Sequence, residues 1–231
     1  PEALGRALKQ GAKAVLITPR AHNPTGVSIT QQRAQQLKDV LSQYPDVMVL
    51  EDDHFSLLAT TKHYSVIPES TRNWAIFRSV SKGLGPDLRM AFVAGDDESI
   101  KRINSRLAPG MSWVSRVLQA LVHTCLTNPI FQQQLADSIA QCKNQRDVLV
   151  NALVNEGIAF TRPSDGLNVW IPVEADSKAV AFTLSQKGWL VRPGNSFDVE
   201  AESHAIRVSI QKIEPKTASK FARDVAAIVA P

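Results

Sequence analysis

Short apolar runs alternate with amphipathic segments over residues 2–112 of the chain. The apolar runs are AVLITP (14–19), VMVLEDD (47–53), WAIFRSVS (74–81) and MAFVAG (90–95). Runs this short and this continuous in hydrophobicity predict strands of a parallel sheet that is covered on both faces. Between the first two runs, residues 30–45 carry apolar side chains at helical spacing after a Thr30 cap. We therefore expect a βαβ unit and an α/β fold with a mostly parallel sheet flanked by helices.

Two longer helical patterns follow the expected sheet. Residues 112–127 are strongly apolar, and residues 129–157 place apolar side chains at helical spacing up to Gly157, a typical helix end. The remaining sequence indicates strand, helix, strand, strand and helix, which is a small α+β domain. We predict three parts, listed in chain order: a partial large domain over 1–128, an interdomain helix over 129–157, and a small C-terminal domain over 158–231.

Composition narrows the class of protein only slightly. The chain has 231 residues, of which 44% are hydrophobic and 21% charged, as in ordinary globular domains. No apolar run is long enough to cross a membrane, and the N-terminus lacks a secretory signal, so we expect a cytoplasmic protein. The charges sum to +4 without a basic block, and the histidines and the two cysteines show no ligand spacing. These patterns predict neither a metal site nor a nucleic-acid surface on this chain.

Polar side chains follow three of the expected strands at the point where each strand ends. RAHNPTG follows the first, EDDHF the second and SVSKGLG the third. Ligands bind at the carboxyl ends of parallel strands because loops converge there. An amide, a carboxylate and a lysine in this order are the groups that pyridoxal phosphate requires, because the lysine amine forms a Schiff base and the carboxylate keeps the pyridine nitrogen protonated. The sequence therefore predicts pyridoxal phosphate as the cofactor.

The same residues resemble the fold-type-I pyridoxal phosphate enzymes of aminotransferase class I. The motifs that carry the resemblance are HNPTG (22–26), EDD (51–53), SVSK (79–82), LR (88–89) and IRVSI (206–210). The resemblance implies that Lys82 forms the internal aldimine and later acts as the base, while Asp52 pairs with the pyridinium. It further implies that Ser79 and Arg89 hold the cofactor phosphate.

Three other positions have expected roles through the same resemblance. Asn23 is expected to bond the phenolic oxygen of the cofactor and to contact the substrate, and Arg207 to clamp the substrate carboxylate. His54 stands where related sequences carry a tyrosine that bonds the same phenolic oxygen. Imidazole can donate that bond, but its charge changes near neutral pH. Packing or capping remains the alternative role for His54, and an exposed strand arginine the alternative for Arg207.

The family's large domain begins well before residue 14, and the earlier part supplies a helix N-terminus for the phosphate and an aromatic ring that stacks on the cofactor. We therefore expect an N-terminally truncated chain that by itself binds cofactor poorly and catalyses little.

Two functions within the superfamily fit these motifs. EDDHF, SVSKGLGPDLRMAF and GWLVRPGNSF look most like the MocR-type regulators of the GntR superfamily, in particular the PtsJ-like group. In these regulators a winged helix-turn-helix domain, absent from this chain, binds DNA, and the aminotransferase-like domain senses the cofactor or an amino compound. We favour this function, with a homodimer implied by the resemblance. The alternative is a catalytically active aminotransferase acting on an amino acid, and the residues above do not distinguish the two.

Overall fold

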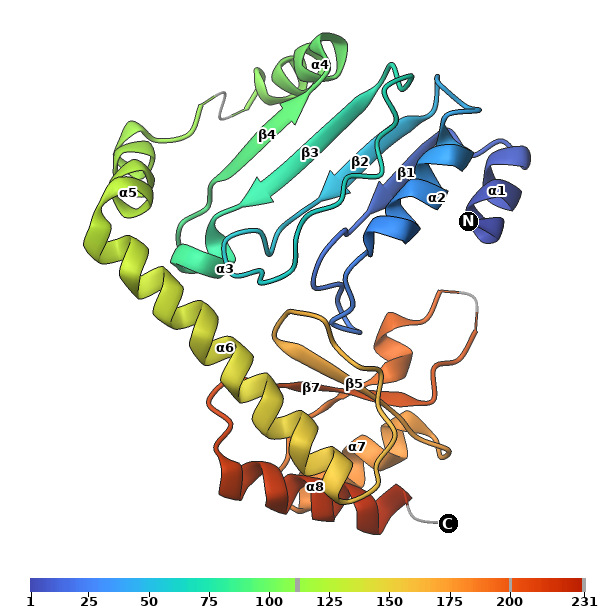
Figure 1. Ribbon diagram of the computed structural model, residues 1–231, viewed down its shortest axis with the longest axis vertical. Coiled ribbons are helices and arrows are strands. Elements are labelled where there is room, and N and C mark those ends of the chain that lie inside the picture. Colours follow the sequence, from blue (N-terminus) through green and yellow to red (C-terminus); the bar gives the residue numbers. More distant parts are fainter. Residues whose placement is uncertain (111–112, 200, 230–231) are drawn as a thin grey trace. The chain divides into compact units, whose positions relative to one another are not determined.

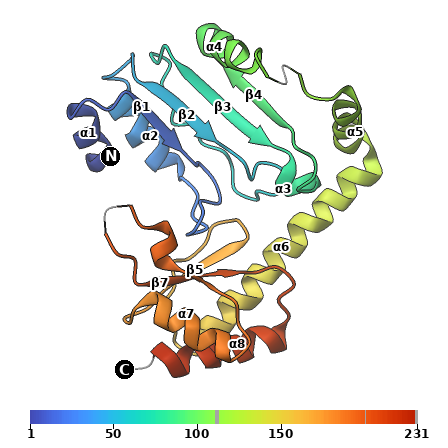
Figure 2. The ribbon, with the colours of Figure 1, turned by 180° about the vertical axis from the view of Figure 1, so that it is seen from behind.

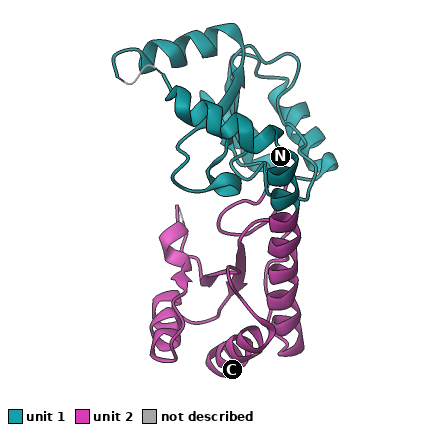
Figure 3. Cartoon of the chain, turned by 90° about the vertical axis from the view of Figure 1, so that its left-hand side faces the viewer, with its two compact units in different colours: residues 1–20, 29–136 teal, residues 21–28, 137–231 magenta. Residues whose placement is uncertain are grey.

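The computed structural model describes residues 1–110, 113–199 and 201–229, and these form two compact units (Figure 3). Unit 1 contains residues 1–20 and 29–136, and unit 2 contains residues 21–28 and 137–231. The division falls inside one long helix, α6 (Pro129–Asn155), whose two ends have different colours in Figure 3. Residue 112, where a helix was expected to begin, lies outside the described residues.

The sheet of unit 1 has four strands in the order β1 (Ala14–Ile17), β2 (Met48–Asp52), β3 (Trp74–Ser79) and β4 (Ala91–Gly95) (Figure 1). The pairs β1·β2 and β2·β3 are parallel, as the βαβ pattern predicted. The pair β3·β4 is antiparallel. Residues 80–90 between them hold only the short helix α3 (Ser81–Leu84), and a parallel connection needs a longer crossover.

Helices α1 (Glu2–Lys9) and α2 (Gln31–Leu41) pack on one face of the β1·β2 pair. Thr30 caps α2 as predicted, since its side chain accepts a hydrogen bond from Arg33 N at 3.2 Å. The core between these helices and the sheet consists of Leu8, Ala34, Leu41, Val47, Val49 and Val66.

The expectation that all four strands are buried on both faces is wrong at the sheet edges. Leu16 of β1 is 69% exposed, and Phe92 and Val93 of β4 are also exposed. Among the described strands of unit 1, only β2 and β3 have neighbours on both sides, and only they contribute fully buried residues. Unit 1 also contains α4 (Asp97–Leu107), which follows β4, and α5 (Arg116–Thr127).

Unit 2 is built on an antiparallel three-stranded sheet in the order β5 (Asn168–Pro172), β7 (Ala205–Ser209), β6 (Arg192–Pro193). Figure 2 shows α7 (Ser177–Gln186) and α8 (Pro215–Val229) beside this sheet. The 3-10 helix η1 (Gly194–Phe197) follows β6 directly.

One face of the small sheet packs against α7, α8 and the second part of α6. The largest fully buried side chains there are Leu149, Leu153, Ile171, Leu184, Ile206 and Ile210. The long helix ends where Gly157 takes a positive φ of 68°, consistent with the helix end expected at this glycine.

Segment 21–28 leaves β1 and packs within unit 2, although it lies inside the range predicted for the first domain. Gly26 explains this packing. Its carbonyl accepts hydrogen bonds from Ser164 N and Asp165 N at 2.8 and 3.0 Å. An added Cβ at Gly26 would lie 2.7 Å from Cβ of Pro163, so only glycine allows this close approach.

Candidate functional site

Asp52 and Ser79 lie at the ends of adjacent strands and face the same side of the sheet. Asp52 ends β2 and pairs in register with Phe77, and Ser79 lies two residues after Phe77 at the end of β3. Residues two apart in a strand point to one face. The Asp52 side chain is 46% exposed, so a ligand can reach its carboxylate.

A polar turn follows Ser79 and contains both Lys82 and Arg89. Ser81 N donates to Ser79 Oγ at 3.2 Å, and Arg89 Nη1 lies 3.4 Å from Ser81 Oγ. Lys82 lies on α3, is exposed, and has no hydrogen bond or ion pair to any part of the chain that the structure describes. The turn therefore presents two hydroxyls, a guanidinium and an uncommitted amine within about ten residues of chain.

His54 lies beside Asp52 in the turn after β2. Its Nδ1 atom is 3.6 Å from Asp52 Oδ2, too far for a good hydrogen bond. The same nitrogen is buried and has no hydrogen-bond partner among the described residues. A buried nitrogen without a partner is costly, so a ligand oxygen that bonds it would remove that cost.

The other two predicted residues, Asn23 and Arg207, meet within unit 2. Arg207 Nη1 donates to Asn23 Oδ1 at 2.9 Å, and the guanidinium lies 5.2 Å from the centroid of the Phe197 ring. Burial, and then the positive charge of Arg192, lower the pKa of Arg207 below its usual value. Its Nε is buried without a partner in the described part of the chain, so this side chain still has hydrogen-bonding capacity.

The structure thus groups the predicted residues into two sets, each inside one unit. The carboxyl ends of β2 and β3 in unit 1 hold the first set, which is Asp52, His54, Ser79, Lys82 and Arg89. Unit 2 holds the pair Asn23 and Arg207. Among the described residues, no group of three or more His, Cys, Asp or Glu side chains is arranged to hold a metal ion, and no helix could cross a membrane.

A buried charged network that the sequence did not reveal lies on the opposite side of the sheet from Asp52. Asp53 is fully buried and accepts hydrogen bonds from Arg20 Nε at 2.9 Å and Arg20 Nη2 at 2.6 Å. Arg78 Nε donates to the same carboxylate at 3.0 Å. Since Arg78 directly precedes Ser79 in β3, the two side chains point to opposite faces.

Glu51 extends this network from the same face of β2. Its carboxylate is fully buried and accepts hydrogen bonds from Val66 N at 2.6 Å, Ser65 Oγ at 2.9 Å and His63 Nε2 at 2.8 Å. Because a carboxylate only accepts, His63 carries its proton on Nε2, and its Nδ1 accepts from Arg78 Nη2 at 3.5 Å. The sequence signal was the pair of carboxylates two residues apart in a buried strand, since buried charges need partners.

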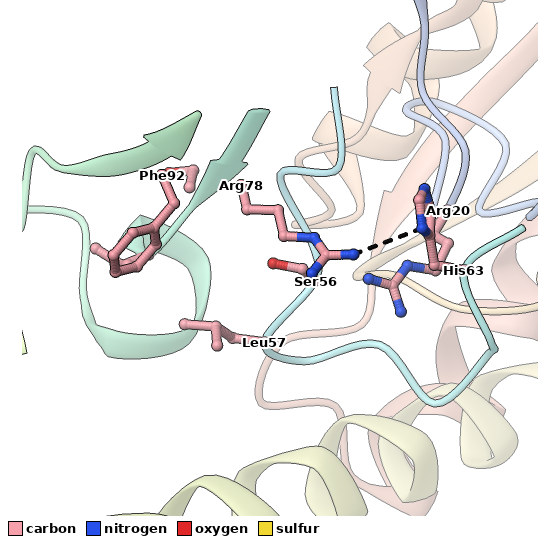
Figure 4. Close-up of a pocket in the computed structure, with 8 residues that line it drawn as sticks. Arg20, Ser56, Leu57, His63, Arg78 and Phe92 are labelled. Atoms are coloured by element: carbon pink, nitrogen blue, oxygen red, sulfur yellow. Dashed lines mark hydrogen bonds between the residues drawn. The ribbon is translucent and has the colours of Figure 1, made fainter. Parts of the chain in front are cut away.

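A pocket of about 500 Å³ lies next to this network (Figure 4). Figure 4 shows Arg78 between Phe92 on one side and Arg20 with His63 on the other. The remaining lining residues are Ser56, Leu57, Ser79 and Val80. Both arginines in this pocket form ion pairs with the single carboxylate of Asp53.

Comparisons with known proteins agree on one family. The model of "Aminotransferase class I and II" matches residues 1–225. The "Vitamin B6 salvage pathway transcriptional repressor PtsJ" of Salmonella typhimurium is 46% identical over 225 residues, covering 97% of this chain and 52% of the repressor. The mitochondrial kynurenine/alpha-aminoadipate aminotransferase of Rattus norvegicus is 27% identical over 229 residues, covering 93% of this chain and 54% of the enzyme. The chain spans about half the length of these curated relatives.

Solved structures show the same fold. LysN, the alpha-aminoadipate aminotransferase from Thermus thermophilus complexed with N-(5'-phosphopyridoxyl)-L-leucine, superposes with a TM-score of 0.84 at 20% identity. The superposition covers 99% of this chain and 61% of LysN. The arrangement of strand-end residues, the family match over nearly the whole sequence and the shared fold have one explanation: the chain belongs to the aminotransferase class I and II family.

Proposed function

We propose that this chain is the pyridoxal phosphate-binding, effector-sensing part of a DNA-binding transcription regulator, with Lys82 as the covalent attachment point. The observation that carries the proposal is the placement of Asp52 and Ser79 on one face at adjacent strand ends, followed by the unpaired amine of Lys82. The 46% identity to a vitamin B6 pathway repressor favours the regulator over other members of the family.

The residues of unit 1 fit the cofactor by their chemistry. Pyridoxal phosphate, when bound, supplies an aldehyde that condenses with amines and a protonated ring that accepts electrons. Asp52 offers an exposed carboxylate for the ring nitrogen, and the Ser79 hydroxyl and the Arg89 guanidinium offer donors for a phosphate. The orphaned Nδ1 of His54 suits a phenolic oxygen.

In this proposal, Asn23 and Arg207 of unit 2 recognise an amino compound. Arg207 binds a carboxylate, and Asn23, whose Oδ1 accepts a hydrogen bond from Arg207 in the same unit, offers a second polar group. Lys82, once the amine of the bound compound has taken its place, would be the base that moves the proton of that compound. An amine that binds one arrangement of the two units more tightly than another shifts their equilibrium. In the regulator, α6 passes this shift to attached DNA-binding domains in a homodimer.

The alternative function is that of an active aminotransferase. It is supported by the 27% identity to the kynurenine/alpha-aminoadipate aminotransferase and by the fold shared with LysN. A sensor and an enzyme use the same lysine and carboxylate, so a kinetic measurement must separate them. Single-turnover transfer of an amino group from several amino acids by the full-length protein would establish the enzyme, and failure with all of them would leave the sensor.

The cofactor proposal is tested by titrating full-length protein with pyridoxal phosphate, followed by borohydride reduction and peptide mass spectrometry. We expect visible absorbance and a pyridoxyl adduct on Lys82 in the wild type, and neither in Lys82→Ala. Lys101→Ala is the control, because Lys101 is an exposed lysine on α4 that lies outside the site. An adduct spread over several lysines, or one retained in Lys82→Ala, would refute the proposal.

The sensing proposal has its own test. Operator binding by the full-length protein is measured with and without pyridoxal phosphate, in wild type and in Lys82→Ala. We expect the cofactor to change the operator affinity of the wild type only. Equal affinities with and without cofactor in the wild type would rule out the coupling.

A further inference from the structure

Two arginines occupy directly opposite positions on the small sheet of unit 2. Arg192 of β6 pairs in antiparallel register with Arg207 of β7. Side chains of such a pair point to the same face, and their Cα atoms are about 4.5–5.5 Å apart. Both line a pocket of about 320 Å³ together with Ser196 and Ser209.

This face is the outer one of the small sheet. Ile206 and Val208, which flank Arg207 in β7, are buried in the core on the opposite face. On the outer face, Phe197 packs against the Arg207 guanidinium at 5.2 Å and meets Trp170 edge to face at 5.7 Å. The aromatic pair therefore packs against one side of Arg207 and restricts the position of its guanidinium group.

The two positive charges affect each other and lack a carboxylate partner. The Arg192 charge contributes to the lowered pKa of Arg207, after burial. No carboxylate forms an ion pair with either arginine in the described ranges, and Arg192 makes no hydrogen bond there. Arg207 uses Nη1 for Asn23, while its buried Nε has no partner among the described residues. Two adjacent guanidiniums with free donors favour an anion with more than one negative charge.

We propose that the pocket between Arg192 and Arg207 selects a small organic dianion, with Arg192 as the residue that recognises the second negative charge. This inference rests on the proposed function, in which Arg207 binds the carboxylate of an amino compound, and it narrows that compound to one with a further acidic group. The second charge belongs either to a separate carboxylate or to a phosphate, and both present oxygens to a guanidinium in the same way.

Calorimetric titration of the full-length protein tests the proposal with glutarate, pentanoate and inorganic phosphate as probes. Glutarate and pentanoate have the same chain length and differ by one carboxylate. We expect the wild type to bind glutarate at least about tenfold more tightly than pentanoate. Arg192→Gln should remove that preference without changing pentanoate binding, and Arg207→Gln should weaken both. Arg223→Gln, an exposed arginine on α8, should behave as the wild type.

The probes also distinguish the source of the second charge. If phosphate binds tightly, needs both arginines, and glutarate binds weakly, the natural ligand carries one doubly charged group. If glutarate binds tightly and phosphate weakly, the natural ligand carries two carboxylates. An Arg192→Gln protein that keeps the preference for glutarate, or a wild type that discriminates no dianion, overturns the proposal. Circular dichroism of each variant confirms the fold. The titration needs no cofactor. If no pyridoxyl adduct formed on Lys82 but the protein still preferred the dianion, the proposed function would be refuted and the dianion proposal would stand.

Discussion

Asp52 and Asp53 are neighbours in the chain, yet their carboxylates lie on opposite sides of the sheet of unit 1. The Asp52 side chain is 46% exposed and lies near His54, whereas the Asp53 side chain is 0% exposed and binds Arg20 and Arg78. The first carboxylate is available to a ligand and the second is committed to the fold. Two neighbouring residues of the EDD motif therefore differ in role: Asp52 is open to a ligand, and Asp53 stabilises the fold.

Removal of the Asp53 carboxylate should destabilise the protein strongly. In Asp53→Ala, Arg20 stays buried with no carboxylate, and a broken buried pair costs about 3–5 kcal/mol. Asp52→Ala should change the free energy of unfolding by less than about 0.5 kcal/mol, as for other partly exposed positions. Urea unfolding of both variants measures the difference.

The cofactor affinity of the same two variants should follow a different pattern. We expect Asp52→Ala to weaken pyridoxal phosphate binding while folding remains intact, because its carboxylate is proposed to face the ring nitrogen. Asp53→Ala should bind cofactor in proportion to its folded fraction. If Asp52→Ala bound the cofactor as well as wild type, Asp52 would have no role at the ring nitrogen.

The sequence predicted the four strands of unit 1 and the helices α2, α5 and α6 from their apolar patterns, and it predicted the Thr30 cap of α2, but it did not predict α4. Alternation along a strand places Asp52 and Asp53 on opposite faces, but the sequence does not show which of the two faces is covered and which is open to a ligand. The direction of β4 was missed because apolar runs carry no information on strand polarity. The partners of Asp53, Arg20 and Arg78, come from distant segments and required the fold.

Glu51 should hold the segment around Val66 against the sheet. Its Oε1 accepts from Val66 N at 2.6 Å and from Ser65 Oγ at 2.9 Å. Glu51→Gln replaces one acceptor oxygen with a donor, which leaves buried donors unsatisfied at a cost of about 1–3 kcal/mol. We expect faster amide hydrogen exchange at Val66 in this variant. Unchanged protection at Val66 would mean that apolar packing alone holds the segment.

Gly26 should be essential for the packing of segment 21–28 in unit 2. Alanine at this position suffers the positive φ of 71° and places its Cβ 2.7 Å from Pro163 and 2.8 Å from the Asn168 carbonyl oxygen. Gly157 has a similar φ of 68° but open space around it. Gly157→Ala therefore measures the cost of the positive φ alone, about 1–2 kcal/mol in the free energy of unfolding.

We expect Gly26→Ala to lose about 1–3 kcal/mol more than Gly157→Ala, the usual cost of overpacking. Amide exchange at Ser164 and Asp165, whose N–H groups donate to Gly26, should rise in Gly26→Ala only. Equal losses of stability in the two variants would show that the segment shifts freely and that the close approach is not required.

Asp96 should make the stability of unit 1 depend on pH under acidic conditions. Its Oδ1 caps α4 through Glu98 N and Ser99 N at 3.0 and 2.9 Å, and its Oδ2 accepts from Trp74 N at 2.6 Å. Burial alone would raise its pKa, but hydrogen bonds from Ser99, Trp74 and Glu98 outweigh burial and lower the pKa to about 2 from 3.8.

A pKa lowered by folding means that the unfolded chain binds the proton more tightly than the folded chain does. The stabilisation by the Asp96 carboxylate is therefore complete above the unfolded value of 3.8 and is lost as the pH falls towards about 2. Asp96→Ala should lose about 1 kcal/mol at neutral pH, as for other N-caps, and progressively less at acidic pH. Urea unfolding across this range gives the profile. Asp96→Asn retains a capping oxygen without a titrating group, so it should differ from wild type by an amount that shrinks below pH 3.8, and a constant difference would exclude Asp96 as the source.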